Sequence, residues 1–296
     1  MSYKEIKGIM PALVTPLKSD RKSLDKKSLR SLIAFHKSQG ADGFYVAGAT
    51  GEGLVLSMKT KKELIDESVA EIGEDKLKII HIADMNFENT VELAKYAEKA
   101  GADAISAIPP IYFGYDSDDI YNYYKSIAKS VDIPLMLYYT PSANITIDTA
   151  LFERLSRIDN ITSIKWTVKD YYRLIELLSR INGRINIING PDEMLLCGLS
   201  AGCSGGIGTT YNVMLPLYKK IYSLYLEGKM QEALEVQKEA DKYISVMLKY
   251  SLIPAVKAIL EEMGYNVGPA SEPMKLYTSE EKKIIINDLK SAGFEF

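Results

Sequence analysis

The sequence predicts an α/β protein, namely a (β/α)8 TIM barrel followed by a C-terminal helical extension. Three observations support this fold class. Short apolar runs alternate with amphipathic stretches through the first two-thirds of the chain, a glycine-containing motif recurs before several runs, and no such run follows Thr210. Strict alternation of strands and helices favours a parallel sheet, and eight units of about 25 to 30 residues favour a closed barrel.

Eight apolar runs are interpreted as the strands. They are Gly8–Pro16, Gly43–Gly48, Lys78–Asp84, Ala102–Pro110, Pro134–Pro141, Ile161–Thr167, Arg184–Gly190 and Ser204–Thr210. The stretches between them are interpreted as helices. Lys61–Ile72, for example, repeats its apolar residues at the spacing of one helical face, and Asn89–Ala100 also has a helical pattern.

An internal repeat supports the alternation. The segments Gly40-Ala-Asp-Gly43, Gly101-Ala-Asp-Ala104 and Gly202-Cys-Ser-Gly205 each precede a predicted strand, and their spacing suits two and four βα units. The first glycine of each is the residue expected to end a helix in the left-handed conformation.

The last third of the chain reads as helical. The predicted helices are Pro216–Glu227, Lys229–Tyr250, Ile253–Met263 and Ser279–Ala292, and the first of them closes the eighth unit. We therefore predict a catalytic barrel domain of residues 1–228 and a helical extension of residues 229–296. Because no Gly/Ser linker separates the two, the extension is expected to pack on the barrel.

Composition limits the partners. The 296 residues are 47% hydrophobic, enough for a large core, and the net charge of −3 comes with no basic patch, so a nucleic-acid partner is not expected. No apolar run approaches the roughly 20 residues that span a membrane, and the N-terminus has no signal-peptide pattern. The two cysteines, Cys197 and Cys203, fit a reducing cytoplasm. Neither His36 nor His81 has a partner at ligand spacing, so no metal is expected.

Lys165 is the residue most indicative of chemistry. It lies in the β-branched run Ile161–Thr167, which is predicted to be a buried strand. A lysine among apolar neighbours is costly as an ammonium and tends to lose its proton, and the neutral amine can then attack a ketone. The alternative is a lysine at a strand end that reaches water or a carboxylate.

Further polar groups follow the other predicted strands, and the carboxyl ends of barrel strands meet on one face. The loop Gly48-Ala-Thr-Gly51 can present backbone N–H groups to a small anion, although it could also be an ordinary tight turn. Tyr112 and Tyr138 could equally belong to a core or interface, in a chain of 20 tyrosines. Asp192-Glu193 could bind a ligand or favour a helix N-terminus.

These motifs together resemble the pyruvate-dependent class I aldolase family that includes N-acetylneuraminate lyase and dihydrodipicolinate synthase. The matching segments are Gly48-Ala-Thr-Gly-Glu52, Tyr138-x-x-Pro141, Lys165-x-Thr167, Gly190-x-Asp-Glu193 and Gly206-Ile-Gly-Thr-Thr-Tyr-Asn212. The resemblance covers nearly the whole chain. It implies a (β/α)8 barrel with a helical extension, usually assembled as a tetramer, and no cofactor other than a covalent Schiff base on the lysine.

By that resemblance, Lys165 forms the Schiff base with the C2 ketone of a 2-keto acid, and Tyr138 shuttles a proton to and from the C4 oxygen. Tyr112 matches a relay tyrosine that the family donates across a subunit interface. Thr50, with the backbone of Ala49, is expected to hold the carboxylate. The family has a serine or threonine where this chain has Ala49, so the resemblance leaves rate or substrate choice open.

The remaining matches favour the lyase branch, which cleaves N-acetylneuraminate to pyruvate and N-acetylmannosamine. Ser142-Ala-Asn144 lacks the arginine with which the synthase grips its substrate. The resemblance implies that the residues binding the sugar acid include Thr167, Gly190, Asp192, Glu193, Gly208 and Thr209. Alternatives are a pyruvate aldolase for a 2-keto-3-deoxy sugar acid, dihydrodipicolinate synthase, and a non-catalytic binder of sugar acids.

Overall fold

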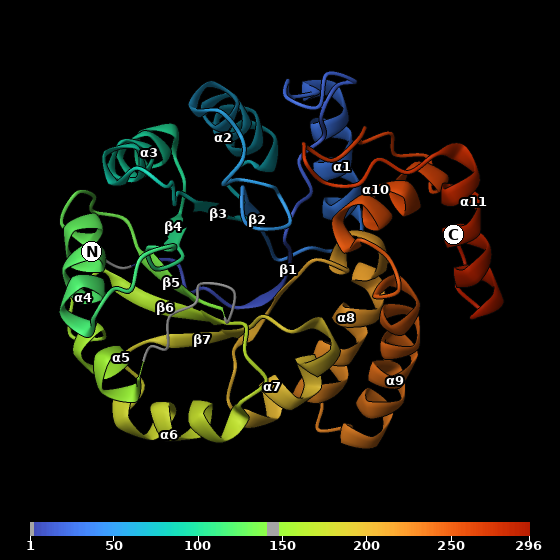
Figure 1. The fold of residues 1–296 in the computed structure, drawn as a ribbon. Coiled ribbons are helices and arrows are strands. Elements are labelled where there is room, and N and C mark those ends of the chain that lie inside the picture. The colour runs from blue at the N-terminus through green and yellow to red at the C-terminus, as the bar shows by residue number, and fades with distance from the viewer. Residues whose placement is uncertain (1–2, 141–147) are drawn as a thin grey trace.

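The computed structural model describes residues 3–140 and 148–296, and its centre is a barrel of eight parallel strands (Figure 1). The strands are β1 (Gly8–Pro11), β2 (Gly43–Val46), β3 (Leu77–His81), β4 (Ala104–Ala107), β5 (Leu135–Tyr139), β6 (Ile161–Trp166), β7 (Asn186–Asn189) and β8 (Gly205–Gly208). Every predicted strand is confirmed, and so is the fold class.

The sheet closes on itself. Each strand pairs with its neighbour in chain order, and β1 pairs in parallel with β8. Between β1 and β2, a bridge joins Ala12 to Tyr45, and the Leu13 amide donates to the Tyr45 carbonyl at 3.0 Å. The strands are shorter than the apolar runs because the last residues of most runs leave the ladder and become the loops at the carboxyl end.

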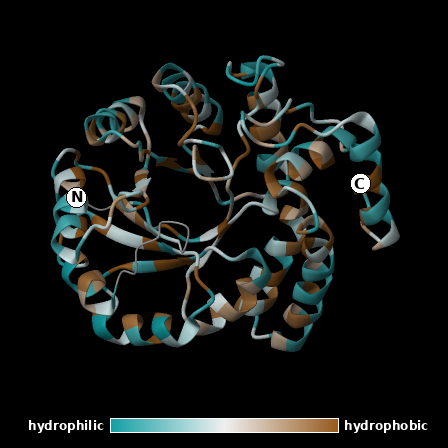
Figure 2. Ribbon diagram, viewed as in Figure 1, coloured by the Kyte–Doolittle hydropathy of each residue, from teal (hydrophilic) through white to brown (hydrophobic). Residues whose placement is uncertain are grey.

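Within the residues that the structure describes, eight helices follow the strands and form a ring around them (Figure 1). They are α1 (Lys26–Ser38), α2 (Met58–Ile72), α3 (Phe87–Ala100), α4 (Ser117–Ala128), α5 (Thr149–Leu155), α6 (Tyr171–Ile181), α7 (Leu195–Ala201) and α8 (Tyr211–Leu226). The ribbon of these helices carries both hydrophilic and hydrophobic residues, as amphipathic helices covering a sheet should (Figure 2). As the repeat predicted, α3 and α7 end at Gly101 and Gly202 in the left-handed conformation.

Side-chain caps define where several helices begin. Asp25, Ser57 and Asp148 accept hydrogen bonds from backbone amides in the first turns of α1, α2 and α5. Helix α8 begins at Tyr211, earlier than predicted, and Pro216 lies inside it just beyond a non-helical Met214. A sequence reading that starts a helix at proline therefore misses its first turn here.

The extension consists of α9 (Met230–Met247), α10 (Leu252–Glu262) and α11 (Ser279–Ser291), drawn orange to red beside α8 in Figure 1. Helix α9 packs against α8 and α7, and α10 contacts α8. The division at residue 228 remains a prediction.

In the described part of the chain, no single helix is long and apolar enough to cross a membrane. Taken together, α9 and α10 meet the criteria of length and composition, but the pair is bent by 109°.

Candidate active site

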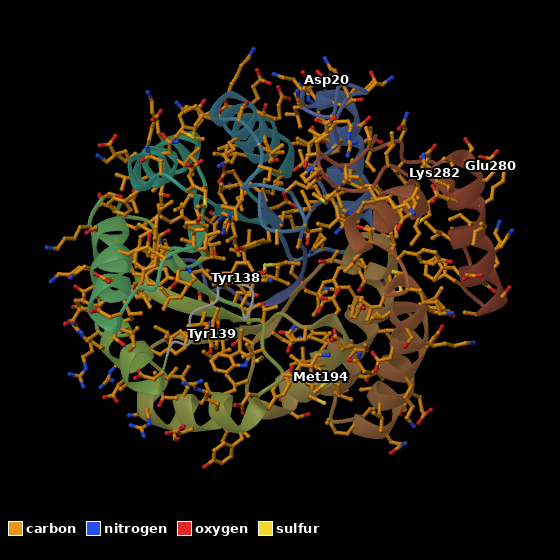
Figure 3. The ribbon with its side chains drawn as sticks, in the orientation of Figure 1. Asp20, Tyr138, Tyr139, Met194, Glu280 and Lys282 are labelled. Carbon is orange, nitrogen blue, oxygen red and sulfur yellow. The ribbon has the colours of Figure 1, made fainter. Side chains whose placement is uncertain are left out.

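Lys165 and Tyr138 lie side by side on adjacent strands. They are register partners on β6 and β5, and the Lys165 amine lies 4.1 Å from the centre of the Tyr138 ring. Lys165 is only 5% exposed, and its amine donates to the Thr167 hydroxyl at 3.3 Å. Figure 3 shows Tyr138 near the middle of the ring of strands. Three residues that the sequence singled out are thus brought together.

Tyr45 and His81 complete this group, and the sequence analysis did not predict their presence. Both rings lie against Tyr138, with centroids 6.1 Å apart in each case, and the Lys165 amine is 5.6 Å from the Tyr45 ring. The Tyr45 hydroxyl donates to Ser106 at 3.0 Å. The sequence gives His81 no partner for a metal, but a polar side chain inside an apolar strand run is a signal that could have placed it in the site.

Burial keeps both of these groups uncharged. It raises the pKa of the Tyr45 phenol well above its ordinary value, and the neighbouring Tyr138 adds to that shift. Burial lowers the pKa of His81 to about 3, with further lowering from Lys61 and Lys165. A neutral phenol and a neutral imidazole therefore surround the amine and the Tyr138 ring.

The glycine-rich loop lies at the end of β2. Ala49 is exposed there, while Thr50 is buried, with its hydroxyl 2.7 Å from the Thr209 hydroxyl after β8. This hydrogen bond joins two predicted substrate-binding residues across the barrel mouth. Within the turn, the Glu52 amide donates to the Ala49 carbonyl at 3.0 Å.

A cavity of about 240 Å³ connects this loop to Tyr138. Ala49 and Glu52 line one part of it, His81 and Tyr138 another, and Met274 from the extension a third. The cavity is large enough for a small keto acid, since one water occupies about 30 Å³ of liquid.

Asp192 and Glu193 open a short 3-10 turn, η2 (Asp192–Met194), after β7, but their environments differ. Asp192 is buried, and its carboxylate accepts from the Thr210 amide at 2.7 Å and from the Thr210 hydroxyl at 2.6 Å. Burial raises the pKa of Asp192 to about 6 despite these bonds. Glu193 is partly exposed and pairs with Lys169 at 2.9 Å.

Gly190 and Gly208 make room for their neighbours. A Cβ on Gly190 would lie 2.0 Å from the Thr167 hydroxyl oxygen, and one on Gly208 would lie 2.2 Å from a carboxylate oxygen of Asp192. Both glycines are therefore required sterically by predicted site residues, whatever else they contact.

Tyr112 lies apart from this group. It follows β4, is 83% exposed with a positive φ of 88°, and its ring packs edge-on against Phe113. Its predicted role depends on a second subunit and stays a prediction. Pro141 and the Ser142–Asn144 stretch lie outside the described residues.

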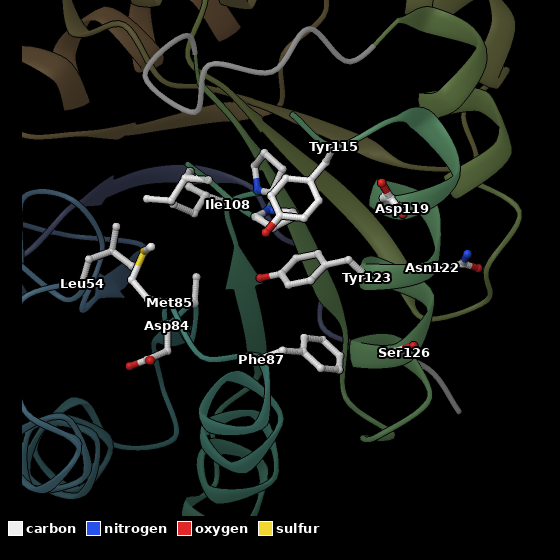
Figure 4. A pocket seen from close by; sticks show the side chains of 14 residues that line it. Leu54, Asp84, Met85, Phe87, Ile108, Tyr115, Asp119, Asn122, Tyr123 and Ser126 are labelled. Atoms are coloured by element: carbon white, nitrogen blue, oxygen red, sulfur yellow. The ribbon is translucent and has the colours of Figure 1, made fainter. Parts of the chain in front are cut away.

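A second cavity, of about 350 Å³, lies between β3–α3 and α4. Figure 4 shows Tyr115 and Tyr123 from the α4 side and Asp84 and Phe87 from the β3–α3 side around it. None of the predicted site residues lines this cavity. Within residues 3–140 and 148–296, no group of three or more His, Cys, Asp or Glu side chains is arranged to hold a metal ion.

Comparison with known proteins identifies the family. The chain belongs to the dihydrodipicolinate synthetase family, whose model matches residues 5–292. The predicted family membership is therefore confirmed.

Individual relatives add detail. The chain is 34% identical over 265 residues to the N-acetylneuraminate lyase of Citrobacter koseri, with 88% of each chain covered. It is similar to the solved structure of CdNal from Clostridium difficile in complex with mannosamine, with 32% identity, a TM-score of 0.94, and 98% of this chain and 100% of that one covered. A dihydrodipicolinate synthase structure also matches, with 27% identity, a TM-score of 0.90, and 97% and 99% coverage. The backbone alone therefore does not separate the two activities.

Proposed function

We propose that this chain is a class I aldolase, a carbon–carbon lyase that reversibly cleaves N-acetylneuraminate to pyruvate and N-acetylmannosamine. The observation that carries the proposal is the buried amine of Lys165, placed 4.1 Å from the Tyr138 ring on the adjacent strand. The Citrobacter koseri relative, at 34% identity, supports the choice of substrate.

The chemistry follows from these two groups. The Lys165 amine adds to the C2 ketone of the open-chain sugar acid, and the Tyr138 phenol gives its proton to the departing hydroxyl, so that loss of water leaves a protonated imine and a Tyr138 phenolate. The phenolate accepts the proton of the C4 hydroxyl, the C3–C4 bond breaks, and its electron pair moves into the imine to give an enamine. N-acetylmannosamine leaves with C4 as its aldehyde carbon. Protonation of the enamine at C3 and addition of water at C2 release pyruvate and the free amine.

We propose that the loop residues and the η2 turn bind different parts of the substrate. Thr50 and the backbone of Ala49 receive the carboxylate, beside the 240 Å³ cavity that Tyr138 also lines. Thr167, Gly208 and Thr209 surround the reacting carbons. Gly190, Asp192 and Glu193 face the polyol tail, because carboxylates can accept several hydroxyl hydrogen bonds at once.

The resemblance to the family also suggests how the protein is assembled, where it lies in the cell and whether it needs a cofactor. We propose a homotetramer in the cytoplasm that requires no cofactor, with Tyr112 reaching the site of a neighbouring subunit. The exposure of the Tyr112 and Phe113 rings supports a contact there, since large apolar surfaces are usually covered in the working assembly.

The test is a coupled assay of pyruvate release from N-acetylneuraminate and from 2-keto-3-deoxygluconate. We expect turnover of the first substrate and little of the second. Turnover of 2-keto-3-deoxygluconate alone would instead identify an aldolase for deoxy sugar acids, in which Ala49 marks the changed specificity. No pyruvate from either substrate would contradict the proposal.

A further inference from the structure

A buried ion pair joins the C-terminal extension to the glycine-rich loop. The Lys257 amine of α10 lies 2.6 Å from a carboxylate oxygen of Glu52, and the two side chains are 3% and 0% exposed. The amine also donates to the carbonyls of Thr15 at 2.8 Å and Pro269 at 2.9 Å. The second Glu52 oxygen accepts from the Ser271 amide at 2.5 Å. The polar atoms of the pair are thus held from both the barrel and the extension.

The loop that this pair holds has a costly conformation. Ala47 and Glu52, neither of them glycine, have positive φ values of 59° and 61°. The chain folds back so tightly that a Cβ on Gly53 would lie 1.8 Å from the Ala47 carbonyl oxygen. Left-handed residues other than glycine persist only where their surroundings enforce them. The Lys257–Glu52 pair supplies such a constraint at one of the two positions.

A second contact extends the constraint to the next residue of the loop. The Thr15 hydroxyl donates to the Gly51 carbonyl at 2.6 Å, while the Thr15 carbonyl accepts from Lys257. Lys257 therefore fixes Glu52 directly and Gly51 through Thr15. Both residues directly follow Thr50, which is proposed to bind the carboxylate.

The extension is itself anchored where it reaches the cavity. The Arg21 guanidinium donates to the carbonyls of Ala270 at 2.7 Å, Ser271 at 3.1 Å and Met274 at 2.5 Å. Met274 lines the same cavity as Ala49 and Tyr138. The extension thus reaches the site as part of its wall.

We infer that Lys257 is a positioning residue for the active site: through Glu52 and Thr15 it fixes the loop that receives the substrate carboxylate. The inference rests on the proposed function for its catalytic meaning. Its structural content, a loop held in place by a lysine of the extension, can be measured without substrate.

The test compares Lys257→Met with Lys78→Met. Lys78 is as deeply buried as Lys257, but it lies at the start of β3, at the opposite end of the barrel, where its amine donates to the Gly73 carbonyl at 3.0 Å. Hydrogen–deuterium exchange of the peptide covering residues 47–53 should become at least tenfold faster in Lys257→Met and stay unchanged in Lys78→Met. The pyruvate concentration for half-maximal borohydride trapping should rise about tenfold or more in Lys257→Met alone, as expected when a hydrogen-bonded charge is lost near an anion site.

The double variant Lys257→Met/Glu52→Gln guards against misfolding, because it leaves no unpaired charge buried. It should fold and still show fast exchange in the loop. Unchanged exchange at residues 47–53 in the folded double variant would overturn the inference. If the wild-type protein traps no pyruvate, the proposed function fails, and the exchange result still decides whether Lys257 holds the loop.

Discussion

Two lysines inside barrel strands, Lys78 and Lys165, have contrasting surroundings. Both are buried, at 1% and 5% exposure. The Lys78 amine, near the amino end of β3, donates to the Gly73 carbonyl at 3.0 Å and lies 3.7 Å from the Asp103 carboxylate. The Lys165 amine, at the carboxyl end of β6, has a hydroxyl and two aromatic rings around it.

The same contrast holds for the other buried lysines. Lys61 lies 2.6 Å from Asp84, and Lys257 lies 2.6 Å from Glu52. Among the residues that the structure describes, Lys165 is the buried lysine without an ion pair. A buried amine with no carboxylate at ion-pair distance can serve as a nucleophile, whereas a paired ammonium serves to hold the structure. We therefore expect Lys165 to react and the paired lysines to hold the structure, at either end of the barrel.

The largest effect should come from replacing Lys165, with replacement of Lys78 as the comparison. Lys165→Met should abolish both pyruvate trapping and cleavage, because no amine remains to form the imine. Lys78→Met should retain pyruvate trapping but lower the free energy of unfolding, because the Asp103 carboxylate loses the buried Lys78 amine that lies 3.7 Å from it. Borohydride trapping and urea unfolding of the two variants would check this. Trapping that survives in Lys165→Met would show that the nucleophile lies elsewhere.

Tyr138→Phe should separate imine formation from bond cleavage. The ring that packs against Lys165 remains, but the hydroxyl that accepts the C4 proton is lost. General acid–base catalysis is worth about 10²–10⁴-fold, so cleavage of N-acetylneuraminate should fall by that factor while trapping of pyruvate persists. A cleavage rate within twofold of wild type would make Tyr138 a structural residue.

Asp192 should make stability depend on pH. Its folded pKa, raised by burial from 3.8 to about 6, exceeds its unfolded value, so the folded state holds the proton more tightly. As the pH rises from about 4 to above 6, ionisation of this group should cost about 3 kcal/mol of stability, at 1.36 kcal/mol per pKa unit. The stability of wild type relative to Asp192→Asn, measured by urea unfolding, should fall by that amount. A constant difference across the range would mean that Asp192 is ionised in the fold at all these pH values.

Ala49→Ser should have the smallest effect. The added hydroxyl enters an exposed position beside the cavity that Tyr138 also lines, and we expect it to give Tyr138 a further partner. Cleavage of N-acetylneuraminate should equal or exceed that of wild type. If cleavage stays negligible in both proteins while another keto acid is turned over, Ala49 marks a different substrate.

The sequence was sufficient for the fold and for part of the site. Periodicity and glycine stops located all eight strands, because buried parallel strands are nearly continuous apolar runs. It placed Lys165, Tyr138 and Thr167 at strand ends, and the barrel brings strand ends together. It did not reveal Tyr45 or His81 as neighbours of Tyr138.

The contacts that were missed depend on three-dimensional packing. Glu52 and Lys257 lie far apart in the chain, and the sequence around neither residue indicates that the extension turns back to the loop. Asp192 was predicted as a ligand for a sugar, whereas its bonds to Thr210 are visible only once η2 and β8 are placed together. Spacing along a sequence predicts elements and strand ends, but not which buried charges are paired.

Lys165, the buried lysine without an ion pair in the described part of the chain, is proposed to form the imine. The direct measurement is borohydride reduction of the wild-type protein in the presence of pyruvate, followed by peptide mass mapping. The reduced pyruvyl group should be found on the peptide containing Lys165, and the peptides containing Lys61, Lys78 and Lys257 should be unmodified. A label on one of those paired lysines, or no label at all, would contradict the account.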